Sequence, residues 1–265
     1  MNILDSLAHP TIDGSWVSKN LDASFETLQK QMKESSVKWA LAVGLAGVGN
    51  YDHEEFFKQC QLYENLFPIA GFDPTDSMNI YDEILRLKTM GFYGIKIHPR
   101  FSQLSLDDEK MNTTFRACAK ANMPVLLCTY FYDRLPCMGN NTFENLVQLV
   151  NRHPDTKIVL VHGGAVDLLR FMELVRFHKN LLLDLSFTIM KYEGSSIDLD
   201  IRFMFRNFDR RICIGTDHPE YSPAALEKRF SFFSQGLSEE KKQNIAYMNL
   251  TGFLGIDIGV LDGGT

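Results

Sequence analysis

The sequence has few of the features that mark membrane, nucleic-acid-binding or secreted proteins. Its 265 residues carry a net charge of −6 and no run of basic side chains, which argues against binding to nucleic acid or to an anionic membrane surface. No apolar stretch is long enough to span a bilayer, and no signal-peptide pattern is visible at the N-terminus. The five cysteines form no CxxC pair, and an odd count without a secretory signal predicts reduced thiols in a cytoplasmic protein.

Several common catalytic motifs are also missing. There is no G-x-S-x-G sequence, which argues against a serine hydrolase built on a nucleophile elbow. There is no G-x-x-x-x-G-K-S/T loop, so nucleotide hydrolysis on a phosphate-binding loop is not expected. Gly44, Gly47 and Gly49 follow a predicted strand in the order GxxGxG, which differs from the dinucleotide-binding fingerprint and is explained by a flexible loop.

Hydrophobic periodicity divides the chain into eight strand-like segments, each followed by a helical pattern. The strand-like segments cover residues 2–5, 39–45, 67–72, 94–98, 125–129, 157–162, 181–186 and 212–215. The helical patterns cover residues 21–36, 54–66, 77–90, 107–122, 142–151, 166–177, 197–208, 226–233 and 239–249. Ser77 is the expected N-cap of the third helix, and Gly91 is expected to end it.

This alternation predicts the fold. Short, almost continuously apolar strands are typical of a parallel sheet that is buried on both faces. Eight strand–helix units fit a (β/α)8 TIM barrel, which typically has about 250 residues. No stretch resembles an interdomain linker, so residues 1–265 are predicted to form a single domain of this kind. A doubly wound parallel sheet is the alternative.

Polar side chains occur at the C-terminal ends of the predicted strands, where the active sites of such barrels lie. Asp217 follows the apolar strand at 212–215, and an ionised carboxylate buried there is costly unless it is paired or bound to a metal. Lys96 and His98 lie two residues apart, so they point to one face, taken as the barrel interior. The other residues of this kind are Asp5, His9, Arg100, Cys128, Tyr130, His162, Asp184 and Ser186.

Each of these residues also has a purely structural explanation. Asp217 could cap the turn that follows it. Free cysteine usually packs as a small apolar side chain, which favours that role for Cys128 over metal binding. The further alternatives are a turn residue at His9, a lysine that reaches the barrel rim at Lys96, and hydrogen-bonded core histidines at His98 and His162. Structural roles do not explain why four strands end in three histidines and an aspartate.

Seven segments of the sequence together resemble the amidohydrolase-related family of metal-dependent hydrolases, which are (β/α)8 barrels of the amidohydrolase superfamily. In chain order they read LDSLAHP, GIKIHP, PVLLC, KIVLVHGG, LLLDLS, CIGTDHPE and LSEEKKQNIAYMNLTGFLGI. The first strand of this family normally carries His-x-His, and the fifth strand ends in a ligand histidine. Here Leu7 stands in the place of the first histidine, two residues before His9, and Cys128 stands at the fifth strand. His162 and Asp217 are retained.

The resemblance implies two alternatives for a cofactor. One is a single divalent metal ion, with zinc preferred because cysteine thiolate binds zinc, whereas leucine binds no cation. Its ligands would be His9, Cys128 and Asp217, with His162 or His98 as a further candidate. The other alternative is a barrel that works without metal, like some lactonases similar to this family. If a weakened metal site remains, Leu7→His is expected to raise the affinity for zinc.

The resemblance also implies a hydrolytic mechanism. Asp217 would be the general base that takes a proton from the attacking water, and His162 would polarise the substrate oxygen. The substrate-binding side chains would be Lys96, His98, Arg100 and Tyr130. The positive charge of Lys96 and Arg100 indicates an anionic substrate, such as a carboxylate or a sugar acid. The bond broken would be a C–O or C–N bond in a small ester, lactone or amide.

Two other functions remain open on the sequence alone. The first is decarboxylation, and the second is non-enzymatic binding by a decayed barrel. The loss of two ligand positions favours a binding protein, whereas the retention of Asp217, His162 and Lys96 opposes it. The expected partner is a small-molecule substrate, not nucleic acid or a membrane, with a homodimer as one option for assembly.

In a metal-free site, Asp217→Asn is expected to keep or raise the melting temperature, because a buried carboxylate opposes folding.

Overall fold

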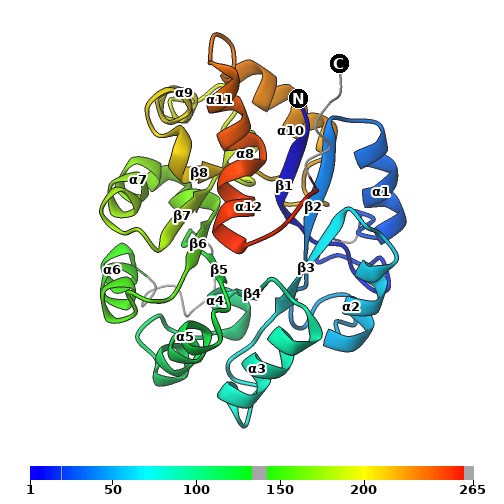
Figure 1. The fold of residues 1–265 in the computed structure, drawn as a ribbon, viewed down its shortest axis with the longest axis vertical. Helices are drawn as coiled ribbons and strands as arrows, with labels where there is room; N and C mark the ends of the chain where they lie inside the picture. Colours follow the sequence, from blue (N-terminus) through cyan, green and yellow to red (C-terminus); the bar gives the residue numbers. More distant parts are fainter. Residues whose placement is uncertain (19, 133–141, 260–265) are drawn as a thin grey trace.

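The computed structural model of the protein describes residues 1–18, 20–132 and 142–259. Eight parallel strands follow one another around a barrel in the order β1 to β8, with helices packed outside them (Figure 1). The strands are β1 (Ile3–Ala8), β2 (Val37–Val43), β3 (Leu66–Gly71), β4 (Gly94–Ile97), β5 (Val125–Cys128), β6 (Ile158–Val161), β7 (Leu181–Asp184) and β8 (Ile212–Cys213). The predicted (β/α)8 barrel is therefore confirmed, and the doubly wound sheet is excluded.

Helices connect each strand to the next and pack around the barrel, and further helices follow β8, of which α12 lies across one end of the barrel against the apolar residues inside it. They are α1 (Phe25–Lys33), α2 (His53–Gln61), α3 (Ile80–Met90), α4 (Pro99–Ser102), α5 (Glu109–Ala121), α6 (Phe143–Arg152), α7 (Leu168–Phe177), α8 (Thr188–Lys191), α9 (Ile197–Asn207), α10 (Pro223–Phe233), α11 (Glu239–Gln243) and α12 (Asn249–Leu254). None of the helices in the described segments is long and apolar enough to cross a membrane.

Backbone hydrogen bonds close the barrel between its last and first strands. The Ser6 nitrogen donates to the Ile214 carbonyl at 2.9 Å, and the Asp217 nitrogen donates to the Leu7 carbonyl at 2.8 Å. β8 itself has only two residues, so these bonds continue the pairing beyond it. The closure brings His9, which follows β1, next to Asp217, which follows β8.

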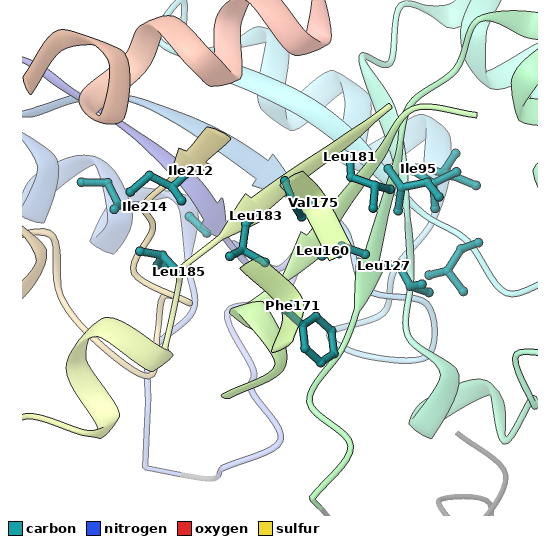
Figure 2. Packing of buried hydrophobic residues seen from close by; sticks show 14 of the residues in the cluster. Ile95, Leu127, Leu160, Phe171, Val175, Leu181, Leu183, Leu185, Ile212 and Ile214 are labelled. Carbon is teal, nitrogen blue, oxygen red and sulfur yellow. The ribbon is translucent and has the colours of Figure 1, made fainter. Parts of the chain in front are cut away.

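Two apolar layers form the core because successive strand residues point to opposite faces of the sheet. The outer layer lies between the strands and the helices. Figure 2 shows part of it, in which Leu160 and Leu183 lie near Phe171 and Val175 of α7. The inner layer fills the barrel below its polar mouth and includes Leu4, Leu7, Leu41, Val43, Leu126, Val159, Val161 and Leu182.

The structure corrects several predicted boundaries. Asn79, and not Ser77, caps α3, because its side chain accepts a hydrogen bond from the Asp82 nitrogen. Gly91 ends this helix in the left-handed conformation, as expected. β1 runs to Ala8, beyond the predicted 2–5. The helix predicted over 239–249 is interrupted by a π-helical turn and continues to Leu254. The four-residue helices α4 and α8 are too short to show a helical period in the sequence.

Candidate active site

A pocket of ≈ 420 Å³ opens where the C-terminal ends of the strands meet. The predicted site residues that line it are His9, Lys96, His98, Arg100, Tyr130, His162 and Asp217. The pocket therefore brings these strand-end side chains together. A pocket of ≈ 540 Å³ beside α2 and α3 is larger, but its His53 and Arg86 already pair with Glu83. The smaller pocket is the better candidate, because active sites of such barrels lie at the strand ends.

Asp217 and His9 lie side by side at the seam of the barrel. His9 Nδ1 hydrogen-bonds to the Val43 carbonyl at 2.7 Å, which orients the ring and leaves Nε2 at 3.5 Å from Asp217 Oδ1. Burial opposes charge on Asp217, but the positive field of His162 and the contact with His9 together lower the pKa of its carboxyl below the ordinary value. Asp217 is therefore ionised at neutral pH.

His162 stands at the end of β6, at the start of a tight turn. Its φ of 70° lies in the left-handed region, which non-glycine residues seldom occupy. Its Nδ1 lies 3.2 Å from the Ser186 carbonyl oxygen, so Nε2 is left for the pocket. Burial lowers the pKa of His162, but the charge of Asp217 and the contact with Cys128 outweigh it and raise that pKa above its ordinary value. His162 thus stays protonated to a higher pH than an ordinary histidine.

Asp184, the last residue of β7, supports His162 from inside the barrel. Its fully buried carboxylate accepts hydrogen bonds from the hydroxyls of Ser6 and Ser186 and from the backbone nitrogens of Ser186, at 3.1 Å, and His162, at 3.3 Å. These donors are what allow a carboxylate to remain buried. The sequence identified Asp184 and Ser186 only as strand-end residues, because their role depends on side chains from three different strands.

Lys96 and His98 come from β4 and the residue after it, and both face the barrel interior as predicted. Lys96 is only 1% exposed, and within the described part of the chain its Nζ has no hydrogen-bond partner. Burial lowers the pKa of Lys96, although the negative charges of Cys128 and Asp217 act against this. His98 stacks on Phe101, with ring centroids 4.1 Å apart. Burial likewise lowers the pKa of His98, so the pocket floor places an amine and an imidazole in poorly solvated surroundings.

The rim of the pocket combines positive charge with aromatic rings. The Arg100 guanidinium, on α4, lies 5.2 Å from the ring centre of Tyr130 and 3.3 Å from His98 Nε2. Lys191 Nζ lies 4.7 Å from the ring centre of Phe187. Cations in such positions are attracted to the ring faces.

Sequence reasoning missed several residues of the pocket wall. Trp16 Nε1 donates to Glu220 Oε1 at 2.8 Å, which joins the loops after β1 and β8, and the Trp16 ring stacks on His9. The others are Val17, Leu45, Phe101, Tyr132, Phe187 and Lys191. They lie in loops or in very short helices without a periodic pattern, and their only signal is a position shortly after a predicted strand.

The residues predicted as zinc ligands do not fit a metal ion. Within residues 1–18, 20–132 and 142–259, no three His, Cys, Asp or Glu side chains form a group that could hold one. His9 and Asp217 face each other, whereas Cys128 is not among the residues that line the pocket. The amine of Lys96 interacts with both Asp217 and Cys128, and its positive charge repels a cation. We therefore derive no chemistry through a metal.

The fold and the pocket together define a (β/α)8 barrel with a polar site at its mouth, and sequence comparison identifies the family. The family model described as amidohydrolase matches residues 46–255, so the chain belongs to the amidohydrolase family. This confirms the resemblance drawn from the strand-end motifs. No curated protein matches the chain.

Similar solved structures agree in fold over almost the whole chain. An uncharacterised TIM-barrel protein of Bordetella bronchiseptica superposes with a TM-score of 0.78 at 16% identity, covering 97% of this chain and 100% of the other. A probable 2-pyrone-4,6-dicarboxylic acid hydrolase of Acinetobacter baumannii gives 0.70 at 19% identity, covering 97% and 100%. The 5-carboxyvanillate decarboxylase of Sphingomonas paucimobilis gives 0.70 at 15% identity, covering 97% and 99%. At these identities the likeness concerns the fold alone.

Proposed function

We propose that this pocket hydrolyses a small anionic ester, lactone or amide, with Asp217 as the general base. One observation carries the proposal. An ionised carboxylate, Asp217, and an imidazole with a raised pKa, His162, line the same pocket, with Lys96 beside them. A base and a proton donor kept in opposite ionisation states by their surroundings are typical of acid–base catalysis.

The proposed steps use these groups in turn. Asp217 accepts a proton from a water molecule as that water attacks the scissile carbonyl carbon. Protonated His162 donates a hydrogen bond to the carbonyl oxygen as negative charge develops on it, and Lys96 adds positive charge in a site of low dielectric. The C–O or C–N bond then breaks, and the leaving group takes up the proton held by Asp217.

Charge and shape support an anionic substrate. Arg100 and Lys191 carry positive charge at the rim, where a carboxylate outside the reacting bond could bind. Tyr130, Phe187 and Trp16 supply flat apolar surface for the body of the ligand. A volume of ≈ 420 Å³ is within the range of about 300–1,000 Å³ that is typical of pockets for small molecules.

Decarboxylation is the second candidate, because the pocket could bind a carboxylate at Arg100 and surround it with aromatic side chains. A carboxylate that loses its water shell in such a site is destabilised relative to carbon dioxide. The hydrolase and the decarboxylase among the similar folds are compatible with either reaction, and the ionised base Asp217 favours hydrolysis.

The experiment is a substrate panel with two readouts. Lactones and esters that carry a free carboxylate are compared with their uncharged methylamides, and proton release and carbon dioxide release are both recorded. We expect proton release from anionic members only, and a loss of at least tenfold in kcat/KM for them in Arg100→Gln. Carbon dioxide release without ester cleavage would replace hydrolysis by decarboxylation. Binding without either reaction would support the non-enzymatic binding protein.

A further inference from the structure

Trp16 and Glu220 form a bridge across the mouth of the barrel, and the steps above give this bridge no part. Trp16 lies in the loop after β1, Glu220 lies in the turn after β8, and both line the pocket. Trp16 Nε1 donates a hydrogen bond to Glu220 Oε1 at 2.8 Å. A hydrogen bond to a carboxylate is stronger than one between neutral groups, so this contact can hold the indole ring in one orientation.

The indole ring covers His9, which is the partner of the proposed base. The ring centroids of Trp16 and His9 are 5.5 Å apart, with 24° between the ring planes, so the two rings stack. His9 Nδ1 is fixed by the Val43 carbonyl at 2.7 Å, which leaves Nε2 facing Asp217 Oδ1 at 3.5 Å. This separation is long for a direct hydrogen bond, so a small tilt of the imidazole would break the alignment. Trp16 lies where it limits such a tilt.

Glu220 belongs to the same turn as the base itself. The Glu220 nitrogen donates a hydrogen bond to the Asp217 carbonyl at 2.9 Å. Asp217 has a φ of 59°, in the left-handed region that non-glycine residues seldom adopt. The bridge therefore reaches both members of one pair, the ring of His9 through Trp16 and the backbone of Asp217 through Glu220.

The loop that carries Trp16 is closed at its base by other hydrogen bonds. The Thr11 nitrogen donates to the Ala23 carbonyl at 2.7 Å, and the Ala23 nitrogen donates to the Gly14 carbonyl at 3.0 Å. Loss of the hydrogen bond to Glu220 should therefore free the indole ring without unfolding the loop.

We propose that Trp16 and Glu220 are positioning residues that keep His9 and Asp217 aligned, so that the carboxylate faces the attacking water. The inference rests on the proposed hydrolysis, in which Asp217 takes a proton from that water. Without the bridge, the imidazole and the carboxylate can turn away from each other. A smaller share of the bound substrate then meets a correctly oriented base, which lowers the rate of the chemical step.

The first test is a double-mutant cycle. Trp16→Phe keeps an aromatic face but has no N–H group, and Glu220→Ala removes the acceptor. Each change should lower kcat about tenfold and change KM by less than about threefold, because misalignment of the base slows the reaction while the binding surface stays in place. The double variant should be no slower than either single variant, since both changes remove the same hydrogen bond. Glu220→Gln, whose amide oxygen can still accept from Trp16 Nε1, should restore most of the loss seen in Glu220→Ala.

Three outcomes of this cycle would overturn the proposal. Additive losses in the double variant would mean that the two residues act separately. A higher KM at unchanged kcat would make Trp16 a surface for substrate binding only. A lower melting temperature with unchanged kcat and KM would make the bridge merely structural. Glu64→Ala, at an exposed position before β3 and at the other end of the barrel, is the matched control and should keep both constants.

The second test needs no substrate, because the chain has only two tryptophans, Trp16 and Trp39. Trp39 stacks near Tyr247 and does not line the pocket, so Trp39→Phe leaves Trp16 as the single reporter. In that background, Glu220→Ala should lower the fluorescence anisotropy of Trp16 and increase its quenching by acrylamide, since an unheld side chain moves within nanoseconds. Glu220→Gln and Glu64→Ala should change neither property.

The two proposals fail in different ways. If Asp217→Asn loses turnover while Trp16→Phe and Glu220→Ala keep it, hydrolysis stands and the positioning role is overturned. If no member of the substrate panel turns over, hydrolysis fails, and the anisotropy still decides whether Glu220 holds the indole ring. A lower anisotropy in Glu220→Ala supports the bridge, and an unchanged anisotropy overturns it.

Discussion

The carboxylate of Asp184 accepts a hydrogen bond from the backbone nitrogen of His162 at 3.3 Å. It also binds Ser186, whose carbonyl oxygen lies 3.2 Å from His162 Nδ1. One buried side chain thus holds both the backbone and, through Ser186, the ring of the proposed proton donor. This relationship leads to the first prediction.

Asp184→Asn should loosen His162. The amide NH2 would face donors that need an acceptor, so we expect a loss of roughly 1–3 kcal/mol in the free energy of unfolding. At a pH above the His162 pKa, where the ring is neutral, its nitrogen-15 chemical shifts should change from one dominant tautomer to a mixture, which a purely structural role for Asp184 would not cause. Asp155→Asn, at an exposed position, is the control and should change stability by less than about 0.5 kcal/mol. An unchanged tautomer would contradict the role assigned to Asp184.

Turnover should fall on the alkaline side of the pH profile. The pKa of His162 is raised from its ordinary value of 6.5, so the protonated form persists to a higher pH than in an ordinary histidine and is lost as pH rises through the folded-state value. The stability that this group contributes is fully present below about 6.5, the unfolded value, and is lost over the same rise. An NMR titration of the His162 ring, set against the pH profile of kcat, checks the prediction. A His162 midpoint below 6.5 would contradict it.

Lys96→Met should separate stability from activity. Burial lowers the pKa of Lys96, so its charge opposes folding at pH 7, and replacement by an apolar side chain of similar length should raise the free energy of unfolding. This gain should shrink as pH rises from the folded-state pKa towards 10.5, where the wild-type amine is neutral in both states. Turnover should fall at least tenfold.

The exposed Lys88→Met is the control for this change, and it should affect neither property. Denaturant unfolding at several pH values measures the stabilities of both variants. A less stable Lys96→Met protein at pH 7 would mean that the ammonium is well paired in the fold.

Leu7→His should not create a zinc site. Leu7 is fully buried in the apolar layer inside the barrel, beside residues such as Leu41 and Val43, and it does not line the pocket. A histidine there would lose packing and bury an unpaired ring, at a cost of roughly 2–4 kcal/mol. Denaturant unfolding and zinc titration check this, with Leu62→His at an exposed position as the control. Tenfold tighter zinc binding with unchanged stability would restore the expectation drawn from the sequence.

The sequence predicted the barrel and much of its polar mouth because both depend on local patterns. Apolar runs mark strands that are buried on both faces, and a strand end followed by His98, His162 or Asp217 can be recognised without knowledge of its neighbours. Seven of the predicted residues do line one pocket.

What the sequence could not predict depends on how distant segments meet. β1 has a register shift between Asp5 and Ala8, so alternation along the strand does not give the surroundings of Leu7. The contact between Trp16 and Glu220 joins loops from opposite ends of the chain. Contacts of this kind leave no periodic hydrophobic pattern in the sequence.

The charge state of Asp217 is a further property that only the assembled site reveals. The sequence predicted that Asp217→Asn keeps or raises the melting temperature, since a buried carboxylate is costly. In the structure, burial does oppose the charge, but His162 and His9 outweigh it and lower the pKa of Asp217 below 3.8. The charged form therefore stabilises the fold above about pH 4, and this contribution is lost as pH falls through the folded-state pKa. The expected effect of Asp217→Asn at pH 7 is now a lower melting temperature.

The most direct test of the proposed hydrolysis is the turnover number of Asp217→Asn. Wild-type and variant proteins, both treated with a chelator and dialysed, are assayed with the best anionic lactone or ester of the substrate panel. Asparagine has nearly the shape of aspartate but accepts no proton from water, so we predict that kcat falls by about 10²–10⁴-fold. A variant that turns over within threefold of the wild type would show that Asp217 is not the general base and would contradict the account.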